Sequence, residues 1–427
     1  MRAFVDLWDE ILQERYGVED PKFRRFRYGV QVNSLGLTEQ QPENNVYRIL
    51  IEMLAVTLSK KARARAVQLP AWNEALGLPR PWDQQWSMRM QQIMAYETDL
   101  LEYDDLFDNN PAVDRKVAEL KEGARAELAN LGSMGGAIES IEYMKSRLVD
   151  SNADRLNRIE KQETVVVGVN RWTEGEASPL VGEDGGIMVV DPAVEQEQIA
   201  RLNEWRDERD SAAVKAALAG LREAASNGQN VMEASIAAAK AGVTTGEWAG
   251  EMRKIYGEYR GPTGVSKSVS NKTEGLDDIR DAVNAVSDKL GRRMRFLVGK
   301  PGLDGHSNGA EQIAFRARDC GMEIDYEGIR LTPTELVRAA QENEVHVVGL
   351  SILSGSHIPL VEDMMAQMRD AGVGHIPVIV GGIIPDDDAK RLLEMGVAKV
   401  YTPKDFELNT IMMDIVTLVD PKSIAAE

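Results

Sequence analysis

The stretch RFLVGKPGLDGHSNG occupies Arg295–Gly309 and consists of a short apolar run followed by a glycine-rich loop. The apolar run is typical of a parallel strand that is covered on both faces. The loop carries Asp304 and His306, whose side chains can bind ligands. Because open α/β sheets bind ligands at the carboxyl ends of their strands, this stretch predicts both a fold class and the position of a site.

Four further β-like runs follow this strand, and each is succeeded by loop and helix signals. They are Glu323–Tyr326, Val345–Ser351, Pro377–Gly382 and Lys399–Thr402. Strands that alternate with helices indicate βαβ units in a parallel sheet. We therefore predict that residues 291–427 form a five-stranded, doubly wound domain of the flavodoxin-like, Rossmann type.

The loop after the first strand has the residue types of a metal ligand with its supporting groups. A neutral imidazole can bind a metal through one ring nitrogen while a carboxylate holds the other nitrogen and fixes the tautomer. Asp304 stands two residues before His306, and Lys300 at the end of the strand can pair with Asp304. The loop alone leaves a second interpretation open, in which Asp304 and His306 only cap the following helix.

Two more motifs end later strands of the same predicted sheet. They are Ser351-Ile-Leu353, separated from Gly309 by 41 residues (310–350), and Gly381-Gly382, separated from Leu353 by 27 residues (354–380). With the D-x-H-x-x-G pattern at residues 304–309, these motifs resemble the cobalamin-binding family that carries the D-x-H-x-x-G, S-x-L and G-G signature. Three motifs at strand ends, in the family's spacing, favour the ligand interpretation over the capping one.

The resemblance implies that His306 is the axial ligand of the cobalt, in place of the cofactor's own nucleotide base. Asp304 and Lys300 would support the imidazole. The Ser351 hydroxyl would hydrogen-bond the buried base, and the glycine pair would leave room for the nucleotide tail. The implied cofactor-binding residues are Lys300, Asp304, Gly305, His306, Gly309, Ser351, Leu353, Gly381 and Gly382, with His357 as a candidate at the cofactor's edge.

Residues 1–170 alternate short β-like runs with long amphipathic helices. The expected strands are Arg27–Asn33, Arg65–Leu69 and Thr164–Asn170, with a helix at Asn44–Lys60 and two or three more between Pro79 and Gln162. Three strands are too few for a complete (β/α)8 TIM barrel, which takes about 250 residues. We therefore predict a partial barrel in which Trp82, Trp86 and Met88, at helical spacing, lie in the core.

Residues 171–290 are expected to be a linker and a helical connector. The polar, Gly- and Pro-containing segment Arg171–Pro192 is typical of a linker. The Ala-rich segment Val194–Tyr259 predicts helices, Gly264–Thr273 a loop, and Leu276–Leu290 a further helix.

Composition excludes several classes of protein. The formal net charge of −19 over 427 residues argues against broad nucleic-acid binding, which requires clustered Lys and Arg. The chain has no apolar run of the roughly 18 residues that a membrane span needs, and no secretory signal at Met1. A single cysteine, Cys320, excludes an intramolecular disulfide and is expected to pack in a helix. We therefore expect a cytoplasmic protein that binds neither membranes nor nucleic acid.

Residues 1–170 resemble the later half of the catalytic barrel of the coenzyme-A-linked carbon-skeleton mutases. The matching stretches are Arg27–Thr38, Glu43–Tyr47, Asn73–Pro79, Met134–Ala137 and Val167–Asn170. The resemblance implies an adenosylcobalamin-dependent isomerase, an acyl-CoA mutase that rearranges a carbon skeleton through radicals formed by homolysis of the cobalt–carbon bond. By position, Gln31 would hydrogen-bond the acyl group and Glu74 would hold the adenosyl ribose.

Two departures from the methylmalonyl-CoA branch of this family bear on the substrate. Gly29 stands where that branch has a histidine, and Arg65–Pro70 replaces its Gln-Ser-Leu-His-Thr-Asn run. The amino-acid sequence in Arg27–Leu50 and Trp82–Asp108 is more similar to the branch that converts ethylmalonyl-CoA to methylsuccinyl-CoA. One methylene changes specificity by only about 1–3 kcal/mol, so methylmalonyl-CoA, with succinyl-CoA as product, remains the alternative.

The family's barrel starts some two hundred residues earlier, and Met1 aligns with an interior helix. The resemblance therefore implies a truncated or split form that lacks the N-terminal part of the barrel. We expect either a homodimer or a complex with a polypeptide that supplies this part, and little catalysis by the chain alone. A non-catalytic cobalamin-binding subunit or carrier is the second alternative, because it would use the same His306 and need no barrel.

Overall fold

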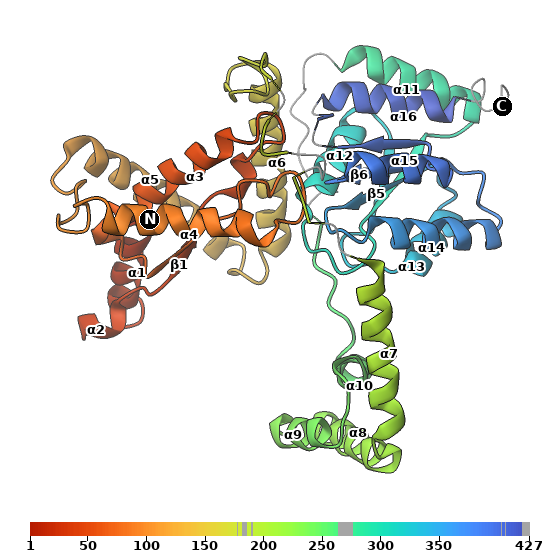
Figure 1. The fold of residues 1–427 in the computed structure, drawn as a ribbon, viewed down its shortest axis with the longest axis horizontal. Coiled ribbons are helices and arrows are strands. Elements are labelled where there is room, and N and C mark those ends of the chain that lie inside the picture. Colours follow the sequence, from red (N-terminus) through yellow and green to blue (C-terminus); the bar gives the residue numbers. More distant parts are fainter. Residues whose placement is uncertain are drawn as a thin grey trace. The chain divides into compact units, whose positions relative to one another are not determined.

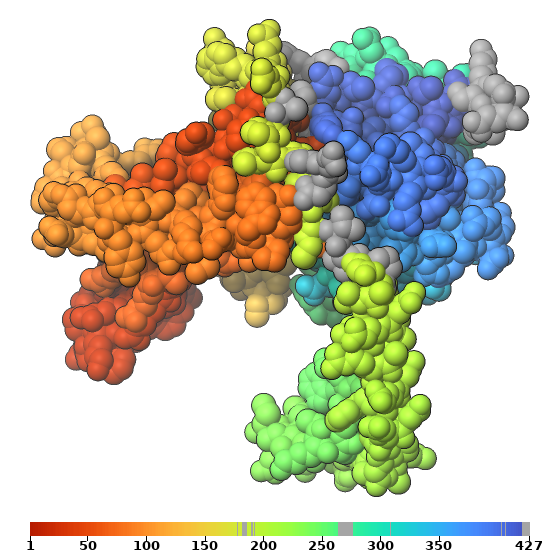
Figure 2. All heavy atoms as spheres, in the orientation of Figure 1, coloured from red at the N-terminus to blue at the C-terminus, as the bar shows by residue number. Residues whose placement is uncertain are grey.

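The computed structural model contains two compact units. One comprises Met1–Met188 and Pro262–Glu427, and the other comprises Val189–Gly261. The structure describes residues 1–176, 178–181, 186–188, 191–263, 276–402, 404–405 and 407–420 (Figure 2). The expected loop at Gly264–Thr273 lies outside these residues. No helix in the described parts of the chain is long and apolar enough to cross a membrane.

The C-terminal part of the first unit is built on a five-stranded parallel sheet (Figure 1). Its strands are β3 (Arg295–Gly299), β4 (Glu323–Tyr326), β5 (Val347–Ile352), β6 (Val378–Gly382) and β7 (Lys399–Tyr401). The order β4-β3-β5-β6-β7 is that of flavodoxin-like folds, which confirms the predicted fold class. The order reverses between β3 and β5, and ligands bind beyond such a reversal at the carboxyl ends of the strands.

Helices cover both faces of this sheet. They are α11 (Asp277–Leu290), α12 (Asn308–Asp319), α13 (Pro333–Glu342), α14 (His357–Asp370), α15 (Asp386–Glu394) and α16 (Leu408–Val419). Alternate strand residues enter opposite cores: Phe296 packs with α11, α12 and α16, whereas Leu297 packs with α13, α14 and α15. Helix α11, assigned to the connector from the sequence, is therefore part of this domain's core, because its buried face contributes Ile279 and Val283. Cys320, expected in a helix, is the C-cap residue directly after α12 and is fully buried in the same core.

The N-terminal part of the first unit has a two-stranded parallel sheet surrounded by helices. Strands β1 (Gly29–Gln31) and β2 (Ala66–Gln68) pair in register, with Gln31 opposite Gln68. The helices are α1 (Arg2–Glu14), α2 (Pro21–Arg24), α3 (Asn44–Thr57), α4 (Pro81–Tyr96), α5 (Pro111–Ser133) and α6 (Ile141–Glu160), with short 3-10 turns η1 (Ser34–Gly36) and η2 (Lys60–Ala62). Two of the three predicted strands are therefore present.

The third predicted strand, Thr164–Asn170, is wrong, because this segment folds into a turn. The Asn170 side chain accepts a hydrogen bond from the Val166 N–H (2.8 Å) and donates to the carbonyls of Ile159 and Thr164 (both 2.8 Å). Gly168 has a φ of +83°, which only glycine adopts easily, and its N–H bonds the Arg171 carbonyl. These local hydrogen bonds replace those of a β ladder.

The expected aromatic core of α4 is also corrected. Trp82 is 41% exposed and Met88 57% exposed, while Trp86 is partly buried. The fully buried tryptophan is Trp72, just after β2, and its ring centroid lies 6.3 Å from those of both Trp82 and Trp86. Of the three residues predicted from the spacing, Trp82 and Trp86 lie near Trp72, whereas Met88 is exposed.

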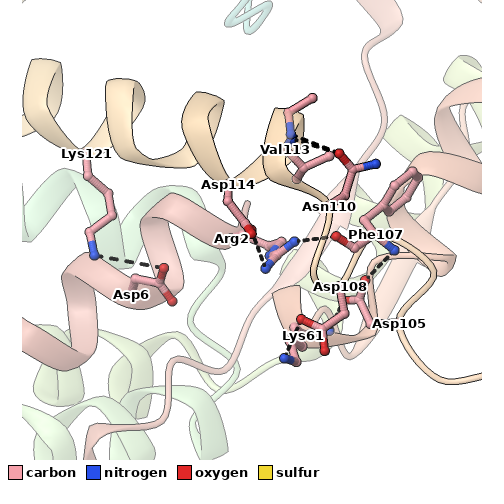
Figure 3. A network of polar contacts seen from close by, with 11 residues as sticks. Arg2, Asp6, Lys61, Asp105, Phe107, Asp108, Asn110, Val113, Asp114 and Lys121 are labelled. Atoms are coloured by element: carbon pink, nitrogen blue, oxygen red, sulfur yellow. Dashed lines mark hydrogen bonds and ion pairs between the residues drawn. The ribbon is translucent and has the colours of Figure 1, made fainter.

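Helix α1 and the loop before α5 are joined by the polar network of Figure 3. Arg2 on α1 donates to the Phe107 carbonyl (3.0 Å) and forms an ion pair with Asp114 on α5 (3.5 Å). Lys61 in η2 binds Asp108 of the same loop (2.5 Å). The contacts fix the path of the chain between α4 and α5.

The second unit is helical, as the Ala-rich sequence predicts. Its helices are α7 (Pro192–Glu208), α8 (Ser211–Ser226), α9 (Met232–Lys240) and α10 (Thr245–Tyr256). The Gly242 carbonyl accepts hydrogen bonds from Trp205 (3.1 Å) and Arg209 (2.8 Å), which fixes the turn before α10 against the end of α7. Thr244 and Glu247 form a capping box that starts α10.

Candidate cobalamin site

The three sequence motifs meet at the carboxyl edge of the five-stranded sheet. In the ladder of β3 and β5, Gly299 is opposite Leu350, so the loop after β3 leaves the sheet beside the end of β5. In the next ladder, Ser351 is opposite Gly381. Segments separated by dozens of residues therefore converge at the strand-order reversal.

The Asp304 carboxylate links two of these motifs directly. Its Oδ2 accepts hydrogen bonds from the Lys300 ammonium (2.8 Å) and from the Leu353 N–H (3.0 Å). Its Oδ1 accepts one from the His306 N–H (3.0 Å) and lies 2.7 Å from His306 Nδ1. Lys300 also donates to the Ser351 carbonyl (2.8 Å). Lys300 is fully buried, so this charge is neutralised inside the protein.

The environment keeps Asp304 ionised. Burial alone would raise its pKa, but the hydrogen bonds from Lys300 and from the N–H groups of His306 and Leu353 lower the pKa well below its usual range. An ionised Asp304 can accept a hydrogen bond from Nδ1–H of His306, and in the tautomer that has this proton the other ring nitrogen, Nε2, keeps a free lone pair.

His306 is presented to solvent while its partner is buried. The imidazole is 78% exposed and the Asp304 side chain is 3% exposed. The N-cap of α12 is Ser307, whose side chain makes no capping hydrogen bond, and the hydrogen bonds of Asp304 go to Lys300, His306 and Leu353. The interpretation of Asp304 and His306 as helix-capping residues is therefore not supported.

The remaining motif residues leave little space between the start of α12 and the carboxyl end of the sheet. A Cβ on Gly309 would lie 3.8 Å from Ser351 Oγ. A Cβ on Gly382 would lie 1.8 Å from the Ile352 carbonyl oxygen, so this glycine is required by the neighbouring strand. A Cβ on Gly381 would have no neighbour closer than 3.9 Å. Of the pair, only Gly381 has room for a Cβ without a clash.

His357, the candidate for the cofactor's edge, has another arrangement. Its side chain is 2% exposed, with Nε2 2.7 Å from Asp388 Oδ2 and Nδ1 3.4 Å from the Ser354 carbonyl. Both ring nitrogens therefore have protein partners, and the imidazole joins the first turn of α14 to α15. The structure gives it a packing contact and no open face for a ligand.

The N-terminal part brings Glu74 towards the same loop. Glu74 follows β2 and is half-buried; burial raises its pKa, while a hydrogen bond from Ser34 and an electrostatic interaction with the nearby His306 lower it in part. Ser34 begins the 3-10 turn after β1. Gln31 is the last residue of β1 and is exposed.

Asp83 positions the Glu74 segment and was not identified from the sequence. This carboxylate is fully buried and accepts hydrogen bonds from Trp72 Nε1 (3.0 Å), Asn73 Nδ2 (2.8 Å) and the Arg80 guanidinium (2.9 Å). Residues at both ends of the segment 72–80 therefore hydrogen-bond to the same carboxylate, that of Asp83. A signal was present, because a proline at the start of a helix followed two residues later by aspartate is typical of an N-terminus.

Comparison with known proteins identifies both parts of the chain. Residues 294–405 match the model for the B12 binding domain, so the sheet edge described above lies in a domain of that class. Residues 1–258 match the model for methylmalonyl-CoA mutase. The chain belongs to the methylmalonyl-CoA mutase family. The second match extends through α7–α10, which places most of the expected connector within the mutase sequence.

The chain is similar to named members of this family along its whole length. It is 73% identical to ethylmalonyl-CoA mutase of Cereibacter sphaeroides, with 100% of this chain and 65% of that protein covered. The ethylmalonyl-CoA mutase of Methylorubrum extorquens is 61% identical, with 98% and 61% covered. The methylmalonyl-CoA mutase of Cereibacter sphaeroides is 33% identical, with 94% and 57% covered. The chain therefore spans less than two thirds of the length of each relative.

The donor set fits the predicted cofactor, cobalamin, which the B12 binding domain match confirms. An exposed imidazole, with its other nitrogen on an ionised carboxylate, would suit a site at which the protein supplies one nitrogen ligand to the cobalt. His306 would be that ligand, supported by Asp304 and Lys300.

Proposed function

We propose that this chain provides the cobalamin-binding and part of the acyl-CoA-binding machinery of an adenosylcobalamin-dependent isomerase that converts ethylmalonyl-CoA to methylsuccinyl-CoA. The observation that carries the proposal is the contrast in identity within one organism. Identity is 73% to the ethylmalonyl-CoA mutase of Cereibacter sphaeroides and 33% to its methylmalonyl-CoA mutase. The methylmalonyl-CoA reaction is the alternative substrate assignment.

His306 and its partners form the first part of this machinery. When bound, adenosylcobalamin would supply the radical chemistry by which the carbon skeleton rearranges. His306 would hold the cobalt through Nε2, and Asp304 would retain the proton on Nδ1. Lys300 would keep Asp304 ionised within the buried edge of the sheet.

Glu74 and Gln31 form the second part. Gln31 is the last residue of β1 and Glu74 lies in the segment after β2, so both are at the carboxyl ends of parallel strands, where barrel enzymes place catalytic groups. Glu74 accepts a hydrogen bond from Ser34 and lies near His306, a position suited to a hydroxyl-bearing group of the cofactor such as the adenosyl ribose. Gln31 would donate a hydrogen bond to the acyl group of the substrate.

Gly29 supports the choice of the larger acyl group. Gly29 lies in β1, and a Cβ there would be 3.6 Å from the Ala66 Cβ, which is an ordinary contact. The position therefore has room for a side chain, although this sequence has glycine there. The histidine that the methylmalonyl-CoA branch carries at this position would occupy that space.

We also propose that turnover requires a further polypeptide segment that completes the barrel. The relatives are longer, and β1 and β2 form a sheet of only two strands in the described residues. The purified chain should bind adenosylcobalamin but convert ethylmalonyl-CoA only when the missing barrel segment of a relative is added. Robust turnover by the chain alone would overturn this requirement. Cobalamin binding without turnover in either case would favour the non-catalytic carrier.

The cofactor assignment has a spectroscopic test. A His306→Ala variant should lose the absorbance signature of histidine-ligated cobalamin, whereas a His375→Ala variant, altered at an exposed histidine of the same domain, should retain it. An unchanged spectrum in His306→Ala would refute His306 as the ligand.

A further inference from the structure

Arg330 lies in the loop after β4 with a backbone conformation that is unfavourable for arginine. Its φ is +61°, in the left-handed region where a Cβ is crowded. Residues with a side chain persist in this region only when the surrounding structure holds them there, and such positions concentrate at ligand-binding sites.

Backbone hydrogen bonds tie this loop to the one that carries His306. The Leu331 N–H donates to the Lys300 carbonyl (3.0 Å), and the Gly302 N–H donates to the Leu331 carbonyl (2.9 Å). Leu331 is 4% exposed and anchors the loop in the core. As a result, Arg330 Nη2 lies 3.5 Å from the position that a Cβ on Gly305 would occupy. The guanidinium is held beside the residue that precedes His306.

The Arg330 charge has no counter-charge in the described parts of the chain. No carboxylate there forms an ion pair with it, and the side chain is exposed. Two other arginines of the domain have acidic partners: Arg295 binds Glu323, and Arg316 binds Glu160 at 3.2 Å. In a protein with a net charge of −19, a cation without an ion pair beside the metal-ligand loop is a candidate hydrogen-bond donor to an anion or a carbonyl oxygen.

We propose that Arg330 is a cobalamin-binding residue whose guanidinium donates hydrogen bonds to an oxygen acceptor of the cofactor held at His306. This inference rests on the proposed function. The acceptor is either the phosphodiester of the nucleotide tail or a carboxamide oxygen on the macrocycle, because both present oxygens that a planar set of N–H donors recognises. The strained backbone is the cost of aiming the side chain at that acceptor.

The test uses Arg330→Gly, which removes the side chain and suits the positive φ. Titration of the 427-residue chain with hydroxocobalamin, followed by absorbance, should give a Kd raised about 10- to 100-fold, the range of one charge-assisted hydrogen bond. The midpoint of thermal unfolding without cofactor should equal or exceed that of the parent, because the backbone is relaxed. At saturation the variant should show the parent's histidine-ligated spectrum. Arg330→Lys should recover part of the affinity.

The matched control is Arg63→Gly. Arg63 is also an exposed arginine with a positive φ (58°), but it precedes β2 at the end opposite to Glu74. Its substitution should leave the Kd unchanged. An unchanged Kd in Arg330→Gly, or an equal rise in Arg63→Gly, would overturn the proposal. No cobalamin binding by the parent would overturn the proposed function itself, which separates the two failures.

Cobinamide, which lacks the nucleotide and its phosphodiester, identifies the acceptor. If Arg330→Gly weakens cobalamin binding and leaves cobinamide binding unchanged, the guanidinium binds the phosphodiester. If both are weakened alike, it binds the macrocycle's carboxamides.

Discussion

Asp304 accepts hydrogen bonds from one buried ammonium and two backbone N–H groups and also contacts the imidazole of His306. Such a carboxylate cannot be removed without leaving the Lys300 ammonium buried and unpaired. Its role in holding the site is therefore inseparable from its role in stability. The two effects differ in their dependence on pH.

Asp304→Asn should lower the free energy of unfolding by about 3 kcal/mol at neutral pH, the typical cost of breaking a buried ion pair. Because the folded state lowers the pKa of Asp304, its ionised form stabilises the fold above the unfolded-state pKa of about 3.9, and this stability is lost as the pH falls. Urea unfolding from pH 7 to pH 3 should show a difference between variant and parent that is constant above about pH 5 and shrinks below about pH 4.

The control for this prediction is Asp387→Asn, which breaks a solvent-exposed pair with Lys390. Its unfolding curve should match the parent's at neutral pH. A destabilisation by Asp304→Asn that does not change between pH 7 and pH 3 would contradict the assigned charge state.

We expect a single substitution at Gly29 to alter the preference between ethylmalonyl-CoA and methylmalonyl-CoA. Gly29→His, assayed in the complete enzyme, should lower kcat/KM for ethylmalonyl-CoA relative to methylmalonyl-CoA by about 10- to 200-fold, the range for one methylene in an apolar pocket. Competition between the two substrates measures the ratio. Gly29→Ala should change it far less, and an unaltered ratio in Gly29→His would remove Gly29 from the substrate pocket.

At the scale of elements, the β5–β6 ladder separates two glycines that look alike in the sequence. Gly382→Ala places a methyl group against the Ile352 carbonyl, so strand β6 must move away from β5. We expect a loss of about 3 kcal/mol in the free energy of unfolding, as for an overpacked interior.

Gly381→Ala is the matched control, because its new methyl group meets nothing closer than 3.9 Å. Its stability should stay within about 1 kcal/mol of the parent, while its affinity for cobalamin should fall if the nucleotide tail passes there. Equal stabilities of the two variants, measured by chemical denaturation, would contradict the packing seen at Gly382.

The elements of the C-terminal domain were predictable because each strand carries its own pattern of apolar residues between turn signals. Thr164–Asn170 has the same pattern but folds as a turn, since Asn170 and Gly168 satisfy its backbone locally. The difference lies in hydrogen bonds between residues three to eleven apart. The apolar composition of Thr164–Asn170 does not show whether these local hydrogen bonds form.

At the scale of the whole molecule, α6 of the mutase part contacts α12, the helix that follows His306. Arg316 on α12 is buried and donates to Asn157 (2.9 Å) and Glu160 (3.2 Å) on α6 and to Asn409 on α16 (2.6 Å). Lys145 on α6 binds Glu311 on α12 (2.6 Å). These contacts join the two parts of the first unit.

Arg316→Met should weaken this junction by about 2 kcal/mol, the value of a charge-assisted hydrogen bond in a partly buried site. Hydrogen exchange should accelerate in α6 and stay unchanged in β5 and β6, which lie inside the sheet. Arg338→Met, at a 68% exposed arginine of α13, should change neither. Equal acceleration throughout the domain would mean that Arg316 stabilises the C-terminal fold alone.

The sequence by itself predicted the C-terminal fold and the grouping of Lys300, Asp304 and His306, because strand periodicity and the chemistry of a metal ligand are contained in short stretches of chain. The cofactor followed from the resemblance of three motifs to the cobalamin-binding family. Only the tertiary structure decided which neighbours these residues have. Trp72 is buried in place of Trp82, and both ring nitrogens of His357 have protein partners. Asp83 accepts hydrogen bonds from three residues, and Arg330 lies beside Gly305. Those outcomes depend on contacts between distant segments, which local pattern does not encode.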